Sequence, residues 1–466
     1  MDTILGVFQF ISDMGATVMM PVIICIMGCV LRAGFGKSLR AGLTVGIGFI
    51  GLNLVTGLMG DNLAPAVSAM AERFGLSLSV IDVGWPAAAQ IAFASTVGNI
   101  IIPVCLVVNI VMLLTNTTQT VDVDIWDYWH FAFTGALVAI VTGNQVYGVI
   151  AAVLNMVIIM VLGDWTAKGV EETLGLPGVS LPHGFTTAYA PIAIVLNGLI
   201  DRIPVINKIN FDLEKLQKKF GVFGEPILVG TILGMIIGAV AGYGIAPSDS
   251  DPGILGLGIN LGASLVLIPK MAALLMEGLL PVSDAASAFI EKRFSNRGKI
   301  YIGLDSAVGV GHPMTLSVAL ILVPITVFLA VLLPGNKVMP FADLAVIPWM
   351  FVLITPVVKG NGFRSLLIGV VVLTAGLYIA TDLSPLITQA AMDAGFEMGA
   401  ASAISSICDG ANPLTWVITR LNFNPAIGLI AVGIVAVALA LINRKRILKE
   451  AAQMHQGEQS HIEESK

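Results

Sequence analysis

The run from residue 179 to residue 200 combines two properties that rarely occur together. It is apolar enough to lie at membrane depth, yet it contains Pro182, His183 and Gly184 as well as a tyrosine and two threonines. Hydrocarbon tolerates irregular, polar backbone only where that backbone is buried in protein or lines a cavity. A second run with the same character follows at residues 397–418. We interpret the two runs as paired re-entrant hairpins that hold a polar solute midway across a bilayer.

The composition supports a membrane environment for the whole chain. Apolar residues make up 56% of the 466 residues and charged residues only 12%, whereas a soluble domain has about 25% charged residues. The apolar runs are long and do not alternate, which favours helices over an outer-membrane barrel. The segment from Met1 to Phe10 has no basic region and no small-residue cleavage site, so we expect the first hydrophobic helix to direct insertion. The sequence therefore predicts an all-α, polytopic membrane protein.

About 11 transmembrane helices are predicted from the apolar runs. These runs cover residues 17–31, 41–60, 87–114, 131–143, 146–162, 226–246, 253–276, 313–333, 345–358, 363–381 and 425–442. A span usually needs about 17 to 25 residues, so the short runs near 131–162 and 345–381 are the least certain full crossings. With the N-terminus outside, the lysine and arginine clusters between spans and after the last one fall in the cytoplasm, as the positive-inside rule requires. The C-terminus is then cytoplasmic.

The two halves of the chain resemble one another. Four short motifs recur at offsets of 220, 227, 217 and 222 residues: 71–74 with 291–294, 83–86 with 310–313, 143–144 with 360–361, and 190–191 with 412–413. Each half holds five spans and one hairpin, and because five is odd, the second half enters the membrane upside down. Inverted repeats with interrupted segments at matching places are typical of transporters whose site lies near the midplane.

The repeat divides the chain into five segments. They are a first repeat at 1–204, a cytoplasmic amphipathic linker at 205–224, a second inverted repeat at 225–420, a last transmembrane helix at 421–448 and a disordered cytoplasmic tail at 449–466. In the linker, apolar residues and lysines alternate from Asn207 to Phe220, which predicts a helix that lies on the membrane surface or braces the two halves. The tail is rich in Glu, Gln, Ser and His, a composition typical of disorder.

Several motifs resemble one bacterial transporter family. They lie at residues 80–86, 123–126, 129–130, 133–137, 182–184, 223–226, 302–305, 311–312 and 334–336. In these motifs the chain resembles the galactitol-type IIC component of the phosphoenolpyruvate-dependent sugar phosphotransferase system, within the ascorbate/galactitol superfamily. The resemblance implies a homodimer in the bacterial inner membrane, in which a mobile core domain carries the substrate site past a scaffold domain like an elevator. It also implies soluble IIA and IIB partners, with IIB passing phosphate from a cysteine to the bound polyol.

Eight side chains are candidates for substrate binding. They are Trp85, His130, His183, Tyr189, Asp305, His312, Asp409 and Asn412. An ionisable residue at membrane depth is a functional candidate by default, and His183 or Asp305 is our candidate for accepting a proton from a substrate hydroxyl. Asp305 and His312 are seven residues apart, so on one helix they would share a face.

Each candidate has a structural alternative. His183 and Tyr189 could hold the hairpin together by internal hydrogen bonds, and Asp305 could form an internal pair with His312. Trp85 and His130 could anchor helix ends in the membrane interface. Asp409 and Asn412 could cap helices. Asn144 and Asn361 each follow a glycine, so we predict turn chemistry for them and no contact with the substrate.

Two functions of different classes fit these features. The first is a IIC subunit that binds a polyol, translocates it and presents it to phospho-IIB; galactitol, ribitol, an arabitol and related compounds all stay open. The second is an ion-coupled secondary transporter of a polyol or organic acid, which would deliver unmodified solute. The sequence has no G-x-x-x-x-G-K-[ST] motif and no soluble stretch of IIA or IIB size. We therefore predict no phosphoryl-carrying residue, no cofactor, no metal ion and no nucleic-acid partner.

Overall fold

The protein is described here by a computed structural model. The structure describes residues 16–30, 32–73, 79–122, 124, 127–209, 226–248, 251–293, 299–340, 342–394, 396 and 403–464. The chain is mostly helical, at 74%, as the apolar runs predict. Two small parallel sheets accompany the helices.

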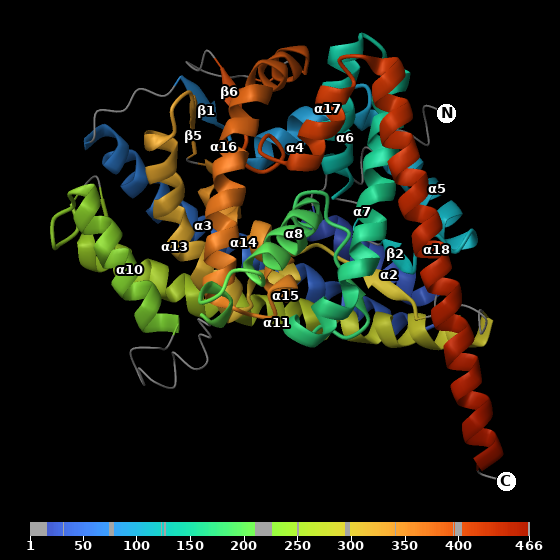
Figure 1. Ribbon diagram of the computed structural model, residues 1–466. Coiled ribbons are helices and arrows are strands. Elements are labelled where there is room, and N and C mark those ends of the chain that lie inside the picture. The colour runs from blue at the N-terminus through green and yellow to red at the C-terminus, as the bar shows by residue number, and fades with distance from the viewer. Residues whose placement is uncertain are drawn as a thin grey trace.

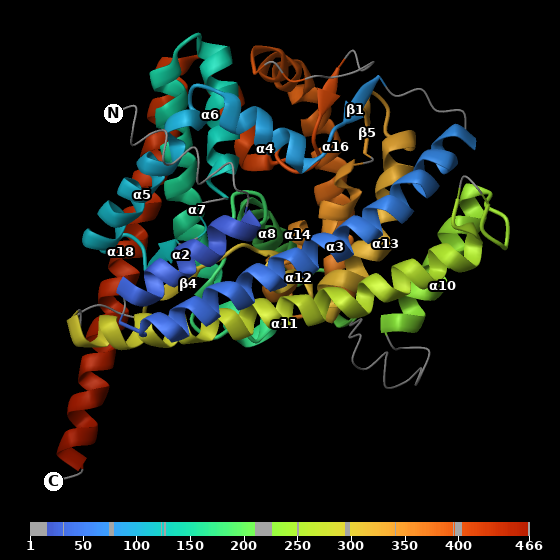
Figure 2. The same cartoon turned by 180° about the vertical axis from the view of Figure 1, so that it is seen from behind.

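Four helices form a layer along one side of the molecule. They are α2 (Ala16–Val30), α3 (Phe35–Arg73), α10 (Pro226–Ala241) and α11 (Gly253–Arg293). α3 and α11 run along one another, with α2 packed on α3 and α10 on α11 (Figure 2). A Cβ on Gly234 of α10 would lie 2.7 Å from the Cα of Gly258 in α11. Glycine thus permits close backbone contact in this layer, as is common between membrane helices.

The other helices form the body that contains the hairpins. They are α4 (Trp85–Ala94), α5 (Gly98–Leu114), α6 (Tyr128–Thr142), α7 (Gln145–Leu174), α8 (Ala190–Ile200), α12 (Ala307–Val310), α13 (Pro313–Leu332), α14 (Ile347–Phe351), α15 (Ile354–Val357), α16 (Gly362–Asp393), α17 (Pro413–Leu421) and α18 (Pro425–Glu464), with 3₁₀ turns η1 (Thr187–Tyr189), η2 (Ile206–Lys208) and η4 (Ala342–Val346). α6, α7 and α18 stand together on one side, α13 and α16 on the other, and α8 lies between them (Figure 1).

Four helices in the described part of the chain are long and apolar enough to cross a membrane: α7, α13, α16 and the segment 425–453 of α18. Several shorter apolar helices accompany them, among them α6 and parts of α5, α10 and α11. The predicted total of about 11 crossings stays a prediction.

Several boundaries differ from the sequence-based expectation. The predicted span 87–114 is two helices, because Ser95 ends α4 by donating to the carbonyl of Ala92 and begins α5 by accepting from the amide of Gly98. The predicted span 345–358 is broken into η4, α14 and α15. α18 continues as a helix to Glu464 through the tail predicted to be disordered, where Glu, Gln and Ala favour helix. Of the predicted linker helix, residues 210–220 lie outside the described residues.

The Gly-Asn motifs at 143–144 and 360–361 form matching turns. Gly143 and Gly360 have φ of 63° and 71°, a left-handed conformation that glycine adopts without strain. Asn144 caps α7 by accepting from the amides of residues 146 and 147, and Asn361 caps α16 by accepting from the amide of residue 364. The predicted turn chemistry is confirmed at both places.

The two sheets join the two halves of the chain. In one sheet β1 (Val80–Asp82) lies between β5 (Val338–Met339) and β6 (Ile404–Ser405); in the other β4 (Tyr301–Gly303) lies between β2 (Thr120–Asp122) and β3 (Val179–Ser180). The central strand of each sheet therefore comes from one half and both of its neighbours from the other. Each sheet is completed only when the two halves meet.

Candidate functional site

The first hairpin leaves regular structure directly after β3. Residues 181–186 are irregular, and buried hydroxyl groups satisfy part of the freed backbone. Thr187 Oγ1 donates to the carbonyl of Leu181 at 2.5 Å, and Thr186 Oγ1 donates to the carbonyl of Trp349 at 2.9 Å. The run therefore has the irregular, buried backbone expected of a re-entrant segment.

The second hairpin meets the first through Asn412. The Asn412 side-chain oxygen caps α17 by accepting from the amides of residues 414 and 415, at 3.0 and 3.2 Å. Its Nδ2 donates to the carbonyl of Gly184 at 3.0 Å and to Asp409 Oδ1 at 3.0 Å. Tyr189 adds a second link, because its hydroxyl donates to the carbonyl of Ala411 at 3.3 Å. The tips of the two hairpins are thus tied to one another.

A group of ionisable side chains, buried apart from the partly exposed Asp305, lies where the hairpins meet α6. His130 Nδ1 is 2.5 Å from Asp409 Oδ2, and His130 Nε2 is 3.7 Å from Asp127 Oδ1. His183 Nε2 is 3.6 Å from Asp127 Oδ2 and 3.5 Å from Asp305 Oδ1. The two imidazole rings lie 4.5 Å apart, centroid to centroid. We call these five residues the histidine–carboxylate cluster.

Gly184 allows the first hairpin to approach α6 at this point. A side chain at Gly184 would collide with His130. Pro182 precedes the loop on the other side of His183 and fixes its own φ. The Pro-His-Gly sequence therefore places His183 next to His130 and leaves no room for a side chain at position 184.

The amide of Thr186 determines how His183 faces the carboxylates. This amide donates to His183 Nδ1 at 3.4 Å, so in the neutral ring the proton lies on Nε2. That proton points toward the oxygens of Asp127 and Asp305. At 3.6 and 3.5 Å, His183 Nε2 faces the two carboxylates without a direct hydrogen bond to Asp127 Oδ2.

The cluster offers more acceptors than donors. A carboxylate oxygen can accept several hydrogen bonds and donates none when ionised, so a ligand with many hydroxyl donors is chemically matched to the cluster. The atoms of Asp127, His130 and His183 that could coordinate a metal ion lie within 4.8 Å of one another. The same is true of the carboxylate oxygens of Asp124, Asp127 and Asp305. These two sets could also hold a cation.

Six of the eight predicted binding residues lie at or beside this cluster. His130, His183, Asp305 and Asp409 belong to it, and Tyr189 and Asn412 link the hairpins next to it. The cap formed by Asn412 confirms its structural alternative, while its Nδ2 bond to Asp409 also joins it to the cluster.

Trp85 and His312 have different surroundings. The Trp85 amide donates to Asp343 Oδ1 at 2.6 Å, and the Asp343 amide donates to Asp82 Oδ2 at 2.7 Å. The backbone of Trp85 is therefore bound to a second pair of buried carboxylates, Asp82 and Asp343. His312 is the N-cap residue of α13. The expectation that Asp305 and His312 share one helix face is wrong, because α12 spans only residues 307–310.

Asp127 is the residue that the sequence analysis missed. It faces both histidines and is 5% exposed. A signal was present, since Asp122, Asp124 and Asp127 follow one another within six residues directly before Trp129 and His130. Such a density of aspartates is unusual in a chain with only 12% charged residues.

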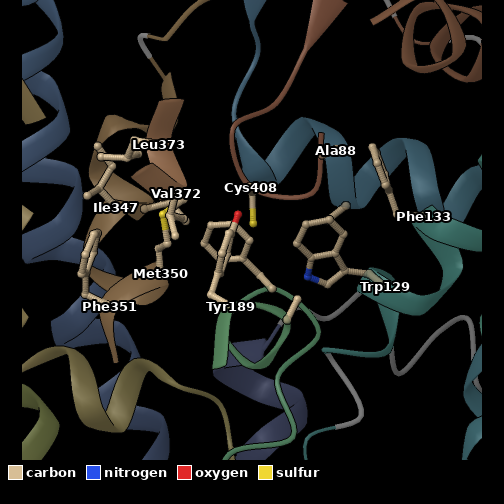
Figure 3. Close-up of a cluster of buried hydrophobic side chains, with 14 of the residues drawn as sticks. Ala88, Trp129, Phe133, Tyr189, Ile347, Met350, Phe351, Val372, Leu373 and Cys408 are labelled. Carbon is tan, nitrogen blue, oxygen red and sulfur yellow. The ribbon is translucent and has the colours of Figure 1, made fainter. Parts of the chain in front are cut away.

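Apolar side chains pack around the hairpin junction. Ile347, Met350, Phe351, Val372 and Leu373 gather on one side of Tyr189, and Trp129 and Phe133 lie on the other (Figure 3). This packing surrounds the junction with apolar side chains on these two sides, and a low local dielectric strengthens electrostatic interactions at the cluster.

A helical membrane protein in which two irregular hairpins enclose a buried group of ionisable side chains has the architecture of a solute permease. The family model "PTS system sugar-specific permease component" (EIIC-GAT) matches residues 9–401. The chain is 41% identical over 444 residues to the "Putative permease IIC component" of Escherichia coli (strain K12), covering 95% of this chain and all of the relative. It is 40% identical over 419 residues to the "PTS system galactitol-specific EIIC component" of the same strain, covering 90% and 91% of the two chains.

The chain therefore belongs to the sugar-specific permease family of the phosphotransferase system. Membership in this family and the apolar helices make it a multi-pass protein of the inner membrane.

Proposed function

We propose that this protein is the IIC component of a phosphotransferase system that takes up a galactitol-like polyol. The histidine–carboxylate cluster is the observation that carries the proposal. It lies at the junction of both hairpins, its members are buried apart from the partly exposed Asp305, and each of its three carboxylates has oxygens that can accept hydrogen bonds. An acyclic polyol carries a hydroxyl on every carbon, so it can donate hydrogen bonds to all three carboxylates.

The charge of the cluster favours a polyol over an organic acid. Asp127, Asp305 and Asp409 lie within the cluster, and an anionic solute placed among buried carboxylates would be repelled in a medium of low dielectric. The ion-coupled transporter of organic acids is therefore the weaker alternative. An ion-coupled polyol transporter would use the same acceptors and is separated from our proposal by the experiment below.

In this function, bound polyol is presented to phospho-IIB. The substrate hydroxyl oxygen attacks the phosphorus, the bond between phosphorus and the IIB cysteine sulfur breaks, and the hydroxyl proton passes to a carboxylate of the cluster. Asp305 is our candidate for this acceptor, and His183 Nε2 lies 3.5 Å from its Oδ1. Catalysis consists of positioning and charge stabilisation, and this chain acts as the transporter subunit of the complex.

The arrangement of the strands supports an inverted repeat. The central strands begin at residues 80 and 301, and each is flanked by two strands of the opposite half. The Gly-Asn caps at 143–144 and 360–361 add a second matched pair. We propose two inverted repeats, with the N-terminus outside and the C-terminus cytoplasmic, that move the site by an elevator-like motion in a homodimer.

The test is uptake into proteoliposomes that contain phospho-IIB and IIA. We expect a radiolabelled polyol from a panel of galactitol, ribitol and arabitols to accumulate as phosphate ester, with no effect of an ion gradient or a chelator. Asp305→Asn should abolish phosphorylation, whereas Asp393→Asn, an exposed carboxylate at the end of α16, should leave it unchanged. Accumulation of free polyol that follows an ion gradient would establish the alternative, and loss of activity with a chelator would show that the cluster needs a metal.

A further inference from the structure

Helix α17 and its two capping residues carry a strip of buried polar side chains. Asn412, Thr415, Thr419 and Asn422 are all between 0% and 1% exposed. Their spacing of three, four and three residues places them on one helix face. The hydrophobic residues Val417 and Leu421 are both 41% exposed on the same helix. The exposed side of α17 therefore suits lipid, and the buried side combines this polar strip with the apolar Ile418.

This polar face lies against α6 and α7. Thr415 Oγ1 is 2.8 Å from Thr134 Oγ1 of α6, and Asn155 Nδ2 of α7 donates to Thr134 Oγ1 at 2.8 Å. Thr134 also donates to the carbonyl of His130 at 3.3 Å. The polar interface thus begins at the histidine–carboxylate cluster and continues along α17.

Three polar atoms in this interface or at the end of α17 beside it have no hydrogen-bond partner among the described residues. They are Thr419 Oγ1, Asn422 Oδ1 and Asn155 Oδ1, and each is fully buried. Thr326 of α13 shows the usual solution for a buried helical threonine, since its hydroxyl donates to the carbonyl of Leu322 at 2.7 Å. The Thr419 hydroxyl does not make the corresponding bond to its own helix.

Three unsatisfied polar atoms in one interface would be costly in a dry protein interior, because each would lose its hydrogen bonds to water without replacement. Water can both donate to the two amide oxygens and accept from the hydroxyl, and buried water typically bridges such groups. Asn422 lies at the end of α17, beside Phe423, which is 56% exposed. The turn from α17 to α18 is at the end of the molecule opposite the C-terminus (Figure 1).

We propose that bound water occupies the polar strip where α17 meets α6 and α7 and forms a hydrated track. The track leads from the surface at residues 422–424 to the histidine–carboxylate cluster. Its functional meaning rests on the proposed site: water displaced by the hydroxyls of an entering polyol leaves along this track, and it returns when the polyol departs. The hydration itself does not depend on the identity of the substrate.

Cysteine labelling tests the track directly. In a background with the four native cysteines replaced by alanine, Thr419→Cys is treated with a small methanethiosulfonate, which requires water to form the reactive thiolate. The matched control is Thr326→Cys, an equally buried helical position with a satisfied hydroxyl in wild type. We expect modification of Thr419→Cys and none of Thr326→Cys. Equal lack of reaction at both positions would overturn the proposal.

A stability measurement on the full-length protein gives an independent readout. Thr419→Val removes the hydroxyl with little change in shape. If water binds that hydroxyl, the Tm falls relative to Thr326→Val; if the hydroxyl lies unpaired in a dry site, the Tm rises. A rise would contradict the hydrated track. Neither measurement uses polyol transport, so failure of the proposed polyol function would leave both results interpretable.

Discussion

At the scale of single residues, Asp127 provides the sharpest test of the cluster, because among the described residues it is the carboxylate that faces both imidazoles. We expect Asp127→Asn to weaken polyol binding by about 1.5–3 kcal/mol, the value of a hydrogen bond to a charged group. Isothermal titration with the purified protein in detergent measures the change. Asp201→Asn is the control, since Asp201 is exposed and pairs with Arg364 away from the cluster. Equal affinity in Asp127→Asn and wild type would remove Asp127 from the site.

The pair of His130 and Asp409 joins α6 to the second hairpin at 2.5 Å. Because each side chain is the other's partner, the effects of His130→Gln and Asp409→Asn on the free energy of unfolding should not be additive. We expect a coupling energy of about 0.5–3 kcal/mol in a double-mutant cycle of the free energy of unfolding. His130→Gln combined with Asp382→Asn, which alters a separate ion pair with Arg420, should be additive. Additivity in both cycles would show that the first pair contributes no coupling.

The residues of the cluster were predictable to the extent that their chemistry was rare. His183 and Asp305 stood out because few ionisable side chains occur in such an apolar chain. Asp127 did not stand out, since charge-based topology rules give little weight to acidic residues. His312 was placed with Asp305 by helical spacing, and that inference fails because the helix breaks at residues 311–312.

At the scale of elements, the close approach of the first hairpin to α6 depends on Gly184. We expect Gly184→Ala to lower both the Tm and the polyol affinity, because the added methyl group would collide with His130 and separate the hairpin from α6. Gly198→Ala is the matched control. A Cβ at Gly198, in α8, meets no atom within 4 Å, and alanine in a helix is favoured over glycine by up to about 1 kcal/mol. Thermal unfolding and ligand titration distinguish the two variants. Equal changes of Tm and of polyol affinity in Gly184→Ala and Gly198→Ala would contradict the steric argument.

Long apolar runs predicted the approximate positions of most helices, but not their interruptions. The break between α4 and α5 depends on one serine hydroxyl, at Ser95, inside an otherwise apolar run. The strands in the described part of the chain contain only two or three residues each, too few for an alternating pattern to appear. Their pairing is determined by contacts between residues more than 100 positions apart, which a local pattern does not contain.

At the scale of the whole molecule, the two halves are completed by one another. Val80 donates its amide to the carbonyl of Lys337, and Ile302 donates its amide to the carbonyl of Gly178. Each half alone would leave the backbone groups of a buried strand unpaired, which is costly at membrane depth. The cluster has the same dependence, because Asp127, His130 and His183 come from the first half and Asp305 and Asp409 from the second. A cluster shared in this way forms only when the halves associate.

Dividing the chain within residues 210–225 tests this interdependence. We expect the two fragments to copurify and bind polyol when they are coexpressed, and to be degraded when either is expressed alone. Ile302→Pro in the second fragment removes the amide that bonds to Gly178, so it should reduce copurification with the first fragment. Affinity purification through a tag on one fragment, followed by quantification of the other, gives the result. Stable accumulation of each fragment alone, with no loss on Ile302→Pro, would mean that the halves fold independently and that the sheets form only after both are complete.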